Sequence, residues 1–268
     1  MTTGEIEAIA QALVSARTHA TGLPEFPGAM PAALDVAYAV QARMMALLDQ
    51  PVAGWKIGRI NGDAADRFGA DRLAGPIFAG QIVDAAAGRV PEVAGYGAGF
   101  IAAEAELMVR LRADVAPDPQ PLSLEEVAGM IDAVHAGIEL ASSPFTGIND
   151  NGPCVTAADL GNSKTLVIGD AIAEPALDTL LDWPVTLAVD GEVVGNGTAR
   201  GLPDGPLGAV RFLLAHLGAR GIMLNAETWI STGAITGVHV VQPGQSVRAR
   251  FGETLCVKCS ISALEADA

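Results

Sequence analysis

Aromatic residues, cysteines and basic residues are all scarce in this sequence. Aromatic residues make up 4% of the 268 residues, so the hydrophobic half of the chain is mainly aliphatic, which is ample for a sizeable core. The 3 cysteines are Cys154, Cys256 and Cys259, an odd and sparse set that argues against a disulfide framework. Cys256 and Cys259 lie in a strand-like segment, where residues three apart point to opposite faces, so they suit neither a redox pair nor a metal clip.

The shortage of basic residues limits the partners that we expect. There are 16 lysines and arginines against 31 acidic residues, which gives a formal net charge of −15. Such a chain repels nucleic acid and anionic lipid, so both are poor partners. An enzyme with an acidic substrate and this composition needs a local cation, either a basic side chain or a metal.

Several common signals are also missing. No apolar run approaches the length of a membrane-spanning helix. The first twenty residues have no basic region followed by an apolar core, so we expect no signal peptide and a cytoplasmic location. The sequence has no phosphate-binding loop, no dinucleotide fingerprint, no nucleophile elbow and no HExxH zinc motif.

Periodicity predicts helices first and strands afterwards. Apolar residues recur at helical spacing in residues 5–16 and 33–50, and again in 206–221. Ser123 with Glu126 forms a capping box that predicts a helix through about residue 134. Because strands and helices then mix without a regular βαβ rhythm, we expect an α+β fold with much antiparallel or mixed sheet. We expect a helical N-terminal portion over residues 1–50 and a catalytic mixed-β domain over 51–268, acting as a single functional unit.

Two strands carry the candidate metal ligands. Residues 99–111 alternate with period two, which places Glu104 and Glu106 on one face and the apolar residues on the other. The next strand, residues 134–142, carries His135 and Glu139 on a shared face. Three carboxylates without cysteine or histidine ligands suit Mg²⁺ or Mn²⁺, which can chelate a 2-oxo acid. A solvated sheet face is the alternative interpretation, although Glu139 has no other charge nearby in the sequence.

Lys56, in VAGWKIGR, is a second candidate. An apolar cleft would lower the pKa of this lysine toward a useful acid–base range. The alternative is a strand lysine whose side chain extends to water.

Together these segments resemble the 2-keto-4-pentenoate hydratase and 4-oxalocrotonate decarboxylase family of the fumarylacetoacetate hydrolase superfamily. The resemblance runs through most of the chain, by the order of its segments: DVAYAVQ, GWKIGR, EAELMVRL, AGIELASS, DLGNSKTLVIG, VDGEVVGNG, GAVRFLLAHL and ISTGAITGVHVVQPGQSVRARFG.

The resemblance implies a wrapped, mixed β-sheet core and a set of site residues. It implies a divalent metal, Mg²⁺ or Mn²⁺, held by Glu104, Glu106 and Glu139, with Lys56 as acid or base. Ser163, Ser231 and Thr232 match family positions near the substrate, where hydroxyls can hydrogen-bond a carboxylate.

One departure from the family concerns the activation of water. Ala74 stands about where the family carries an acidic residue, and Asp71, three residues earlier, is a possible substitute. His135 is another candidate base, with a structural histidine as the alternative.

The resemblance predicts a lyase of aromatic-compound breakdown with a small 2-oxo or 2-hydroxydienoic acid as its partner. The first expectation is a hydratase that adds water to a 2-hydroxy-2,4-dienoate to give a 4-hydroxy-2-oxo acid. The alternative on the same site is a decarboxylase or tautomerase of 2-oxo-3-enedioates such as 4-oxalocrotonate. A non-catalytic binding protein that retains the fold is a third hypothesis, and we expect a homo-oligomer.

Overall fold

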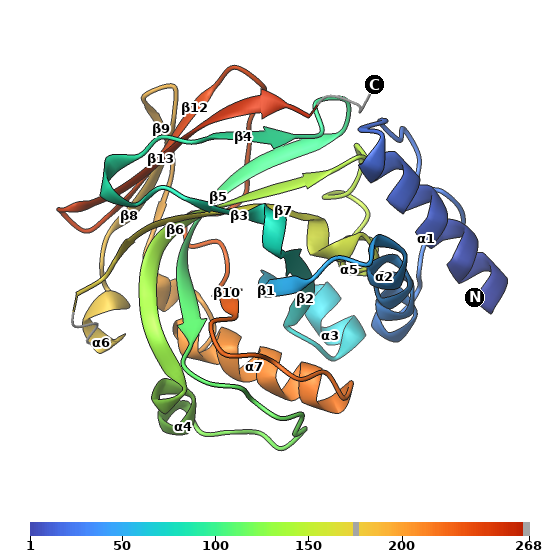
Figure 1. Cartoon of the computed structure of the whole chain (residues 1–268), viewed down its shortest axis with the longest axis horizontal. Helices are drawn as coiled ribbons and strands as arrows, with labels where there is room; N and C mark the ends of the chain where they lie inside the picture. Colours follow the sequence, from blue (N-terminus) through green and yellow to red (C-terminus); the bar gives the residue numbers. More distant parts are fainter. Residues whose placement is uncertain (174–176, 265–268) are drawn as a thin grey trace.

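The computed structural model describes residues 1–173 and 177–264 and has two β-sheets with helices at their margins (Figure 1). The larger, 8-stranded sheet has the order β2-β1-β10-β5-β6-β7-β3, with β11 paired to β5. Its strands are β2 (Arg72–Phe78), β1 (Val52–Arg59), β10 (Trp229–Ser231), β5 (Phe100–Leu111), β6 (Ile131–Ser143), β7 (Ser163–Ala171), β3 (Ile82–Asp84) and β11 (His239–Val240).

The smaller, 5-stranded sheet packs on the outside of the larger one and has the order β4-β13-β12-β8-β9. Its strands are β4 (Glu92–Gly95), β13 (Leu255–Ala263), β12 (Ser246–Phe251), β8 (Val185–Val189) and β9 (Glu192–Gly197). Most neighbouring strands in the two sheets are antiparallel, but β1–β10, β3–β7 and β4–β13 are parallel. The expected mixed, wrapped sheet is therefore confirmed.

The helices lie around these sheets (Figure 1). They are α1 (Thr3–Thr18), α2 (Leu34–Leu48), α3 (Asp63–Phe68), α4 (Leu124–Gly129), α5 (Pro153–Ala158), α6 (Leu177–Leu180) and α7 (Gly205–Ala219). The apolar spacing of residues 5–16 and 33–50 correctly predicted α1 and α2, which pack on each other at one end of the molecule. None of the helices in the described ranges is long and apolar enough to span a membrane.

One predicted boundary was wrong. The Ser123–Glu126 capping box does begin α4, but that helix ends at Gly129 and not near residue 134. The chain then enters β6 at Ile131, because residues 131–143 pair along β5 and their backbone hydrogen bonds are made there. Tertiary pairing thus overrides a local helix signal.

The long antiparallel pair β5–β6 positions the candidate ligands. The apolar face of β5, which includes Ala103, Ala105 and Leu107, belongs to a core shared with β8, β12 and β13. Since side chains alternate across a strand, Glu104 and Glu106 point to the opposite, concave side of the larger sheet. They are buried there by β1, β10 and the loop before β7, so this face is not a solvated one.

Candidate metal centre

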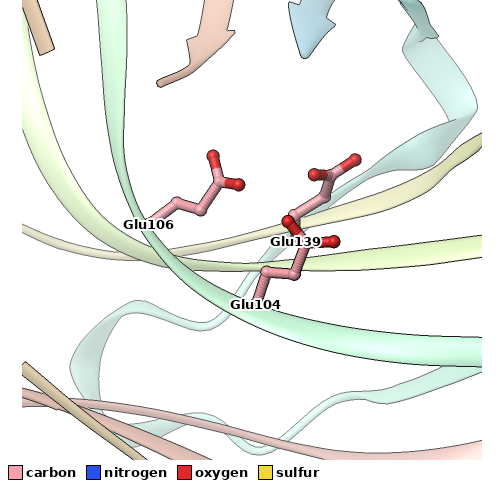
Figure 2. A group of neighbouring side chains, drawn as sticks. All are labelled: Glu104, Glu106 and Glu139. Carbon is pink, nitrogen blue, oxygen red and sulfur yellow. The ribbon is translucent and has the colours of Figure 1, made fainter. Parts of the chain in front are cut away.

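Three glutamates from β5 and β6 converge on one point (Figure 2). Glu104 lies directly opposite Glu139 in the antiparallel register, and Glu106 lies opposite Gly137. One carboxylate oxygen from each of the three lies within 4.8 Å of the other two. Glu106 and Glu139 are completely buried, and Glu104 is 5% exposed.

Glu106 and Glu139 are held by groups from other elements. Glu106 Oε2 accepts hydrogen bonds from the Ser231 hydroxyl and, at 2.8 Å, from the backbone N–H of Gly233. Glu139 Oε2 lies 3.1 Å from Lys56 Nζ on β1. Among the described residues, Glu106 Oε1 and Glu139 Oε1 have no hydrogen-bond partner, although both atoms are buried.

These unpartnered oxygens indicate whether the site suits a metal ion. Buried carboxylate oxygens are costly unless they are paired or bind a cation. Lys56 brings a single positive charge to three carboxylates, so a divalent cation is needed to balance them. An all-oxygen donor set suits a hard ion such as Mg²⁺ or Mn²⁺. The three glutamates therefore fit the metal that the sequence predicted.

The pKa values of Glu106 and Glu139 are raised for the same reason. Burial, with the neighbouring Glu139 and Glu104, raises the pKa of Glu106 well above its usual range, against the opposing effect of Lys56. Burial also raises the pKa of Glu139 to about 7, and Lys56 limits this rise.

Without a bound cation, Lys56 departs from the lowered pKa that burial alone predicts. Its side chain is 3% exposed, and burial by itself lowers the pKa of an ammonium group. The carboxylates of Glu139, Glu104 and Glu106 outweigh burial, so the pKa of Lys56 is raised. The sequence pattern around Lys56 indicated the apolar setting but not the three charges that face it.

Asn162 is a site residue that the sequence analysis missed. Its Oδ1 accepts a hydrogen bond of 3.0 Å from Lys56 Nζ. The short turn of residues 160–162 reaches Lys56 because Gly75 and Gly161 allow close backbone contact: a Cβ on Gly75 would lie 2.2 Å from Leu160 O. Gly161 also has a φ of +67°, which favours glycine. The Gly161-Asn162 sequence beside Ser163 is the signal that marked this turn.

The remaining predicted residues are placed differently. Ser163 is buried beside Glu139, and its hydroxyl lowers the pKa of that carboxyl group, although it forms no hydrogen bond of standard geometry with a described residue. Ser231 donates to Glu106, and Thr232 donates to the backbone carbonyl of Leu107 at 2.8 Å. The structure thus brings Ser231 to the carboxylates, whereas the Thr232 hydroxyl is bonded to the main chain.

The two candidate bases lie outside the lining of the cavity beside Lys56. Asp71 is half exposed and forms an ion pair of 2.7 Å with Arg72. Nδ1 of His135 lies 2.9 Å from the carbonyl oxygen of Gly169, and its ring packs edge-on against Trp229. The backbone N–H of Ala74, near the family position of an acid, donates to the Tyr38 hydroxyl.

A cavity of about 430 Å³ opens next to the glutamates. Its charged lining residues are Lys56, Arg59 and Glu104, and its neutral polar lining includes Asn61, Asn149 and Asn162. This volume suits a small organic acid whose first carboxylate reaches the metal position. One small ligand in this cavity can therefore contact Lys56 and Glu104, the two residues of the metal site that line it.

Comparisons with known proteins agree with this architecture. No family model matches the chain. A 4-oxalocrotonate decarboxylase of Pseudomonas putida is 29% identical over 126 residues, which cover 47% of either protein, so the chain spans about half the length of the curated relative it matches.

Solved structures share the fold over more of the chain. A 4-oxalocrotonate decarboxylase from Pseudomonas putida G7, complexed with magnesium and adipate, has a TM-score of 0.79 at 22% identity and covers 97% of this chain and 98% of its own. Fumarylpyruvate hydrolase from Pseudomonas aeruginosa, in complex with Mn²⁺ and pyruvate, has a TM-score of 0.56 at 18% identity. The match covers 78% of this chain and 89% of the hydrolase chain. The sequence match and the shared fold together support the resemblance predicted from the sequence, to the 2-keto-4-pentenoate hydratase and 4-oxalocrotonate decarboxylase family of the fumarylacetoacetate hydrolase superfamily.

Proposed function

We propose that this protein is a divalent-metal-dependent lyase that removes CO₂ from a 2-oxo-3-enedioate of the 4-oxalocrotonate type. The observation that carries the proposal is the cluster of Glu104, Glu106 and Glu139 beside Lys56, at a cavity of about 430 Å³. The partial match to a decarboxylase supports the same reaction. The adipate bound by the structural relative is a six-carbon dicarboxylate, the same length as such a substrate.

In this reaction the bond between C5 and the distal carboxylate carbon breaks and that carbon leaves as CO₂. The electron pair moves through the conjugated chain to the 2-oxo oxygen, which then takes a proton, and the product is a 2-hydroxy-2,4-dienoate. Mg²⁺ or Mn²⁺, when bound by the three glutamates, would supply positive charge for the first carboxylate and the 2-oxo oxygen.

The residues of the chain have separate roles in this proposal. Glu104, Glu106 and Glu139 hold the cation, and Ser231 and the Gly233 N–H orient Glu106. The Lys56 ammonium, oriented by Glu139 and Asn162, lines the cavity and can donate a proton to the 2-oxo oxygen. Only 3% of Lys56 is exposed, so few solvent contacts compete with this proton transfer.

Hydration of a 2-hydroxy-2,4-dienoate stays a prediction on the same site. It needs a base that activates water, and Asp71 and His135 do not line the cavity. This makes decarboxylation, which needs no water, the better-supported reaction. Homo-oligomer formation, cytoplasmic location and a role in aromatic-compound breakdown also stay predictions.

The test is a pair of assays on EDTA-treated protein before and after Mg²⁺ or Mn²⁺ is restored. The first substrate is 4-oxalocrotonate, with CO₂ measured, and the second is 2-hydroxypenta-2,4-dienoate, with the loss of its absorbance measured. We expect metal-dependent CO₂ release, reduced about 100-fold or more in Lys56→Met. Metal-dependent loss of the dienoate without CO₂ release would favour the hydratase. Absence of turnover with both substrates would contradict the proposal and favour a binding protein.

A further inference from the structure

Arg59 is a cation at the cavity that has no acidic partner among residues 1–173 and 177–264. It is the last residue of β1, is exposed, and lines the same cavity as Lys56 and Glu104. Its Nη1 donates to the backbone carbonyl of Gly201 at 3.2 Å, and no carboxylate of the described residues lies within ion-pair distance. The exposed arginines Arg89 and Arg200 are paired with aspartates. Arg67 resembles Arg59 in forming no ion pair with a described residue, but it does not line the cavity.

Arg59 places a positive charge at the cavity of a chain whose net charge is −15. The guanidinium presents a fork of N–H donors that matches a carboxylate, and only part of it is used by Gly201. A protein with this net charge does not attract an anion over a long distance. A positive charge at the cavity mouth is therefore needed to attract an anionic ligand.

The spacing along β1 fits a dicarboxylate. Lys56 and Arg59 are three residues apart, which is about 10 Å between Cα atoms in a strand. Side chains three apart start from opposite faces of a strand, but Arg59 is at the end of β1 and both residues line the cavity. Lys56 and Arg59 therefore line one cavity along which an extended six-carbon diacid can lie.

We propose that Arg59 binds the distal carboxylate of the substrate and so selects dicarboxylic 2-oxo acids over monocarboxylic ones. This inference rests on the proposed function and names the substrate class within it. The distal carboxylate is the group that leaves as CO₂, so Arg59 contacts it only in the ground state of the reaction. An interaction of this kind contributes to substrate binding and orientation and does not lower the barrier of bond breaking. Loss of Arg59 should therefore raise KM more than it lowers kcat.

A binding experiment tests the proposal without any need for turnover. The probes are adipate and hexanoate, which differ by one carboxylate, titrated calorimetrically into magnesium-saturated wild type, Arg59→Gln and Arg59→Lys. A matched control is Arg67→Gln, because Arg67 is an exposed arginine of α3 that does not line the cavity. It removes the same charge from an exposed position outside the cavity lining.

We expect wild type to bind adipate more tightly than hexanoate. In Arg59→Gln this preference should fall about tenfold or more, because a charged pair with a forked donor is lost. Arg59→Lys should keep part of the preference, and Arg67→Gln should keep nearly all of it. An equal preference in wild type and Arg59→Gln, or no preference in wild type, would overturn the proposal.

Kinetics separate this inference from the proposed function. If wild type releases CO₂ from 4-oxalocrotonate and Arg59→Gln raises KM with a smaller change in kcat, both stand. Decarboxylation with a KM that does not depend on Arg59 would overturn the role of Arg59 alone. If no variant turns over either substrate and the adipate preference still depends on Arg59, the proposed function fails while the carboxylate site stands.

Discussion

Glu104 and Glu139 are a directly opposed pair of carboxylates in the antiparallel register of β5 and β6, and both are buried. Like charges in directly opposed positions destabilise a sheet, and burial adds to the cost. With Glu106 two residues along β5, the pair forms a site whose stability and function both depend on a cation. The carboxylate cluster therefore lowers the stability of the metal-free protein locally, as functional sites commonly do.

The substitution Glu106→Gln should separate the contribution of this carboxylate to metal binding from its cost in stability. It removes one buried negative charge and keeps the volume and the acceptor for the Ser231 hydroxyl. We expect the affinity for Mn²⁺ to fall at least about 100-fold, since a direct ligand is weakened more than an outer partner. In EDTA, the variant should melt at or above the temperature of wild type, because buried like charge is removed.

The same chemical change at the exposed Glu92 of β4 is the control, and it should alter neither quantity. Manganese affinity in Glu106→Gln equal to that of wild type would show that Glu106 is not a ligand. Calorimetric titration and thermal melting of the same three proteins provide both measurements.

Ser231 and Thr232 are neighbours with different partners and should respond differently. Ser231→Ala removes a hydrogen bond that orients Glu106, so the metal affinity should fall about tenfold. Thr232→Val removes a buried hydrogen bond to the Leu107 carbonyl, so stability should fall by about 1–3 kcal/mol with a smaller change in metal affinity. An equal loss of metal affinity in both variants would contradict the assignment of Ser231, and not Thr232, as the residue that orients Glu106.

Periodicity and turn residues predicted much of this arrangement. The alternation of residues 99–111 placed Glu104 and Glu106 on one face, and the polar face of the next strand carried Glu139. Asp190 and Gly191 connect β8 to β9, and an Asp-Gly pair is typical of such tight hairpin turns. These are local patterns, and a strand or a hairpin imposes them over a few residues.

Contacts between distant segments could not be predicted in this way. The raised pKa of Lys56 depends on carboxylates about fifty and eighty residues later in the chain, and Asn162 reaches it only through the approach of Gly161 to Gly75. The capping box of α4 gave a correct start and a wrong end, because the pairing of β6 with β5 decides where the helix stops.

A buried ion pair joins the N-terminal helices to the sheets. Arg17 Nε of α1 donates to Asp159 Oδ1 at 2.7 Å, and the Ser143 hydroxyl donates to the other oxygen of Asp159. Asp159→Asn would leave the Arg17 guanidinium buried without a counter-charge. We expect a loss of about 3–5 kcal/mol in the free energy of unfolding, measured with urea. Arg17→Met combined with Asp159→Asn should cost less than the sum of the single changes.

A loss of less than about 1 kcal/mol in Asp159→Asn would contradict this account, since surface ion pairs have effects of that size. The measurement also bears on the predicted division of the chain at residue 50. A single cooperative transition in wild type and variant would indicate that α1 unfolds together with the sheets.

His216 of α7 should make the protein sensitive to acid. Burial, with the neighbouring Arg220, lowers the pKa of His216 from 6.5 to about 4. A group with a lowered pKa in the folded state contributes stability above its unfolded pKa and loses it as the pH falls. The stability advantage of wild type over His216→Gln should therefore shrink between pH 6.5 and pH 4, by up to about 3 kcal/mol.

Urea unfolding of both proteins at several pH values between 7 and 4 provides this comparison. Acidic groups titrate in both proteins, so their effects cancel in the difference. A difference in stability that does not change with pH would show that His216 is not buried in its neutral form.

The central claim is that three glutamates bind one divalent ion on which turnover depends. The most direct test is a titration of EDTA-treated protein with Mn²⁺, with bound ion followed by electron paramagnetic resonance and CO₂ release from 4-oxalocrotonate followed in the same samples. We predict one bound ion per chain and turnover that rises in parallel with occupancy, both lost in Glu106→Gln. Turnover that is unaffected by EDTA, or Mn²⁺ binding that persists unchanged in Glu106→Gln, would contradict the account.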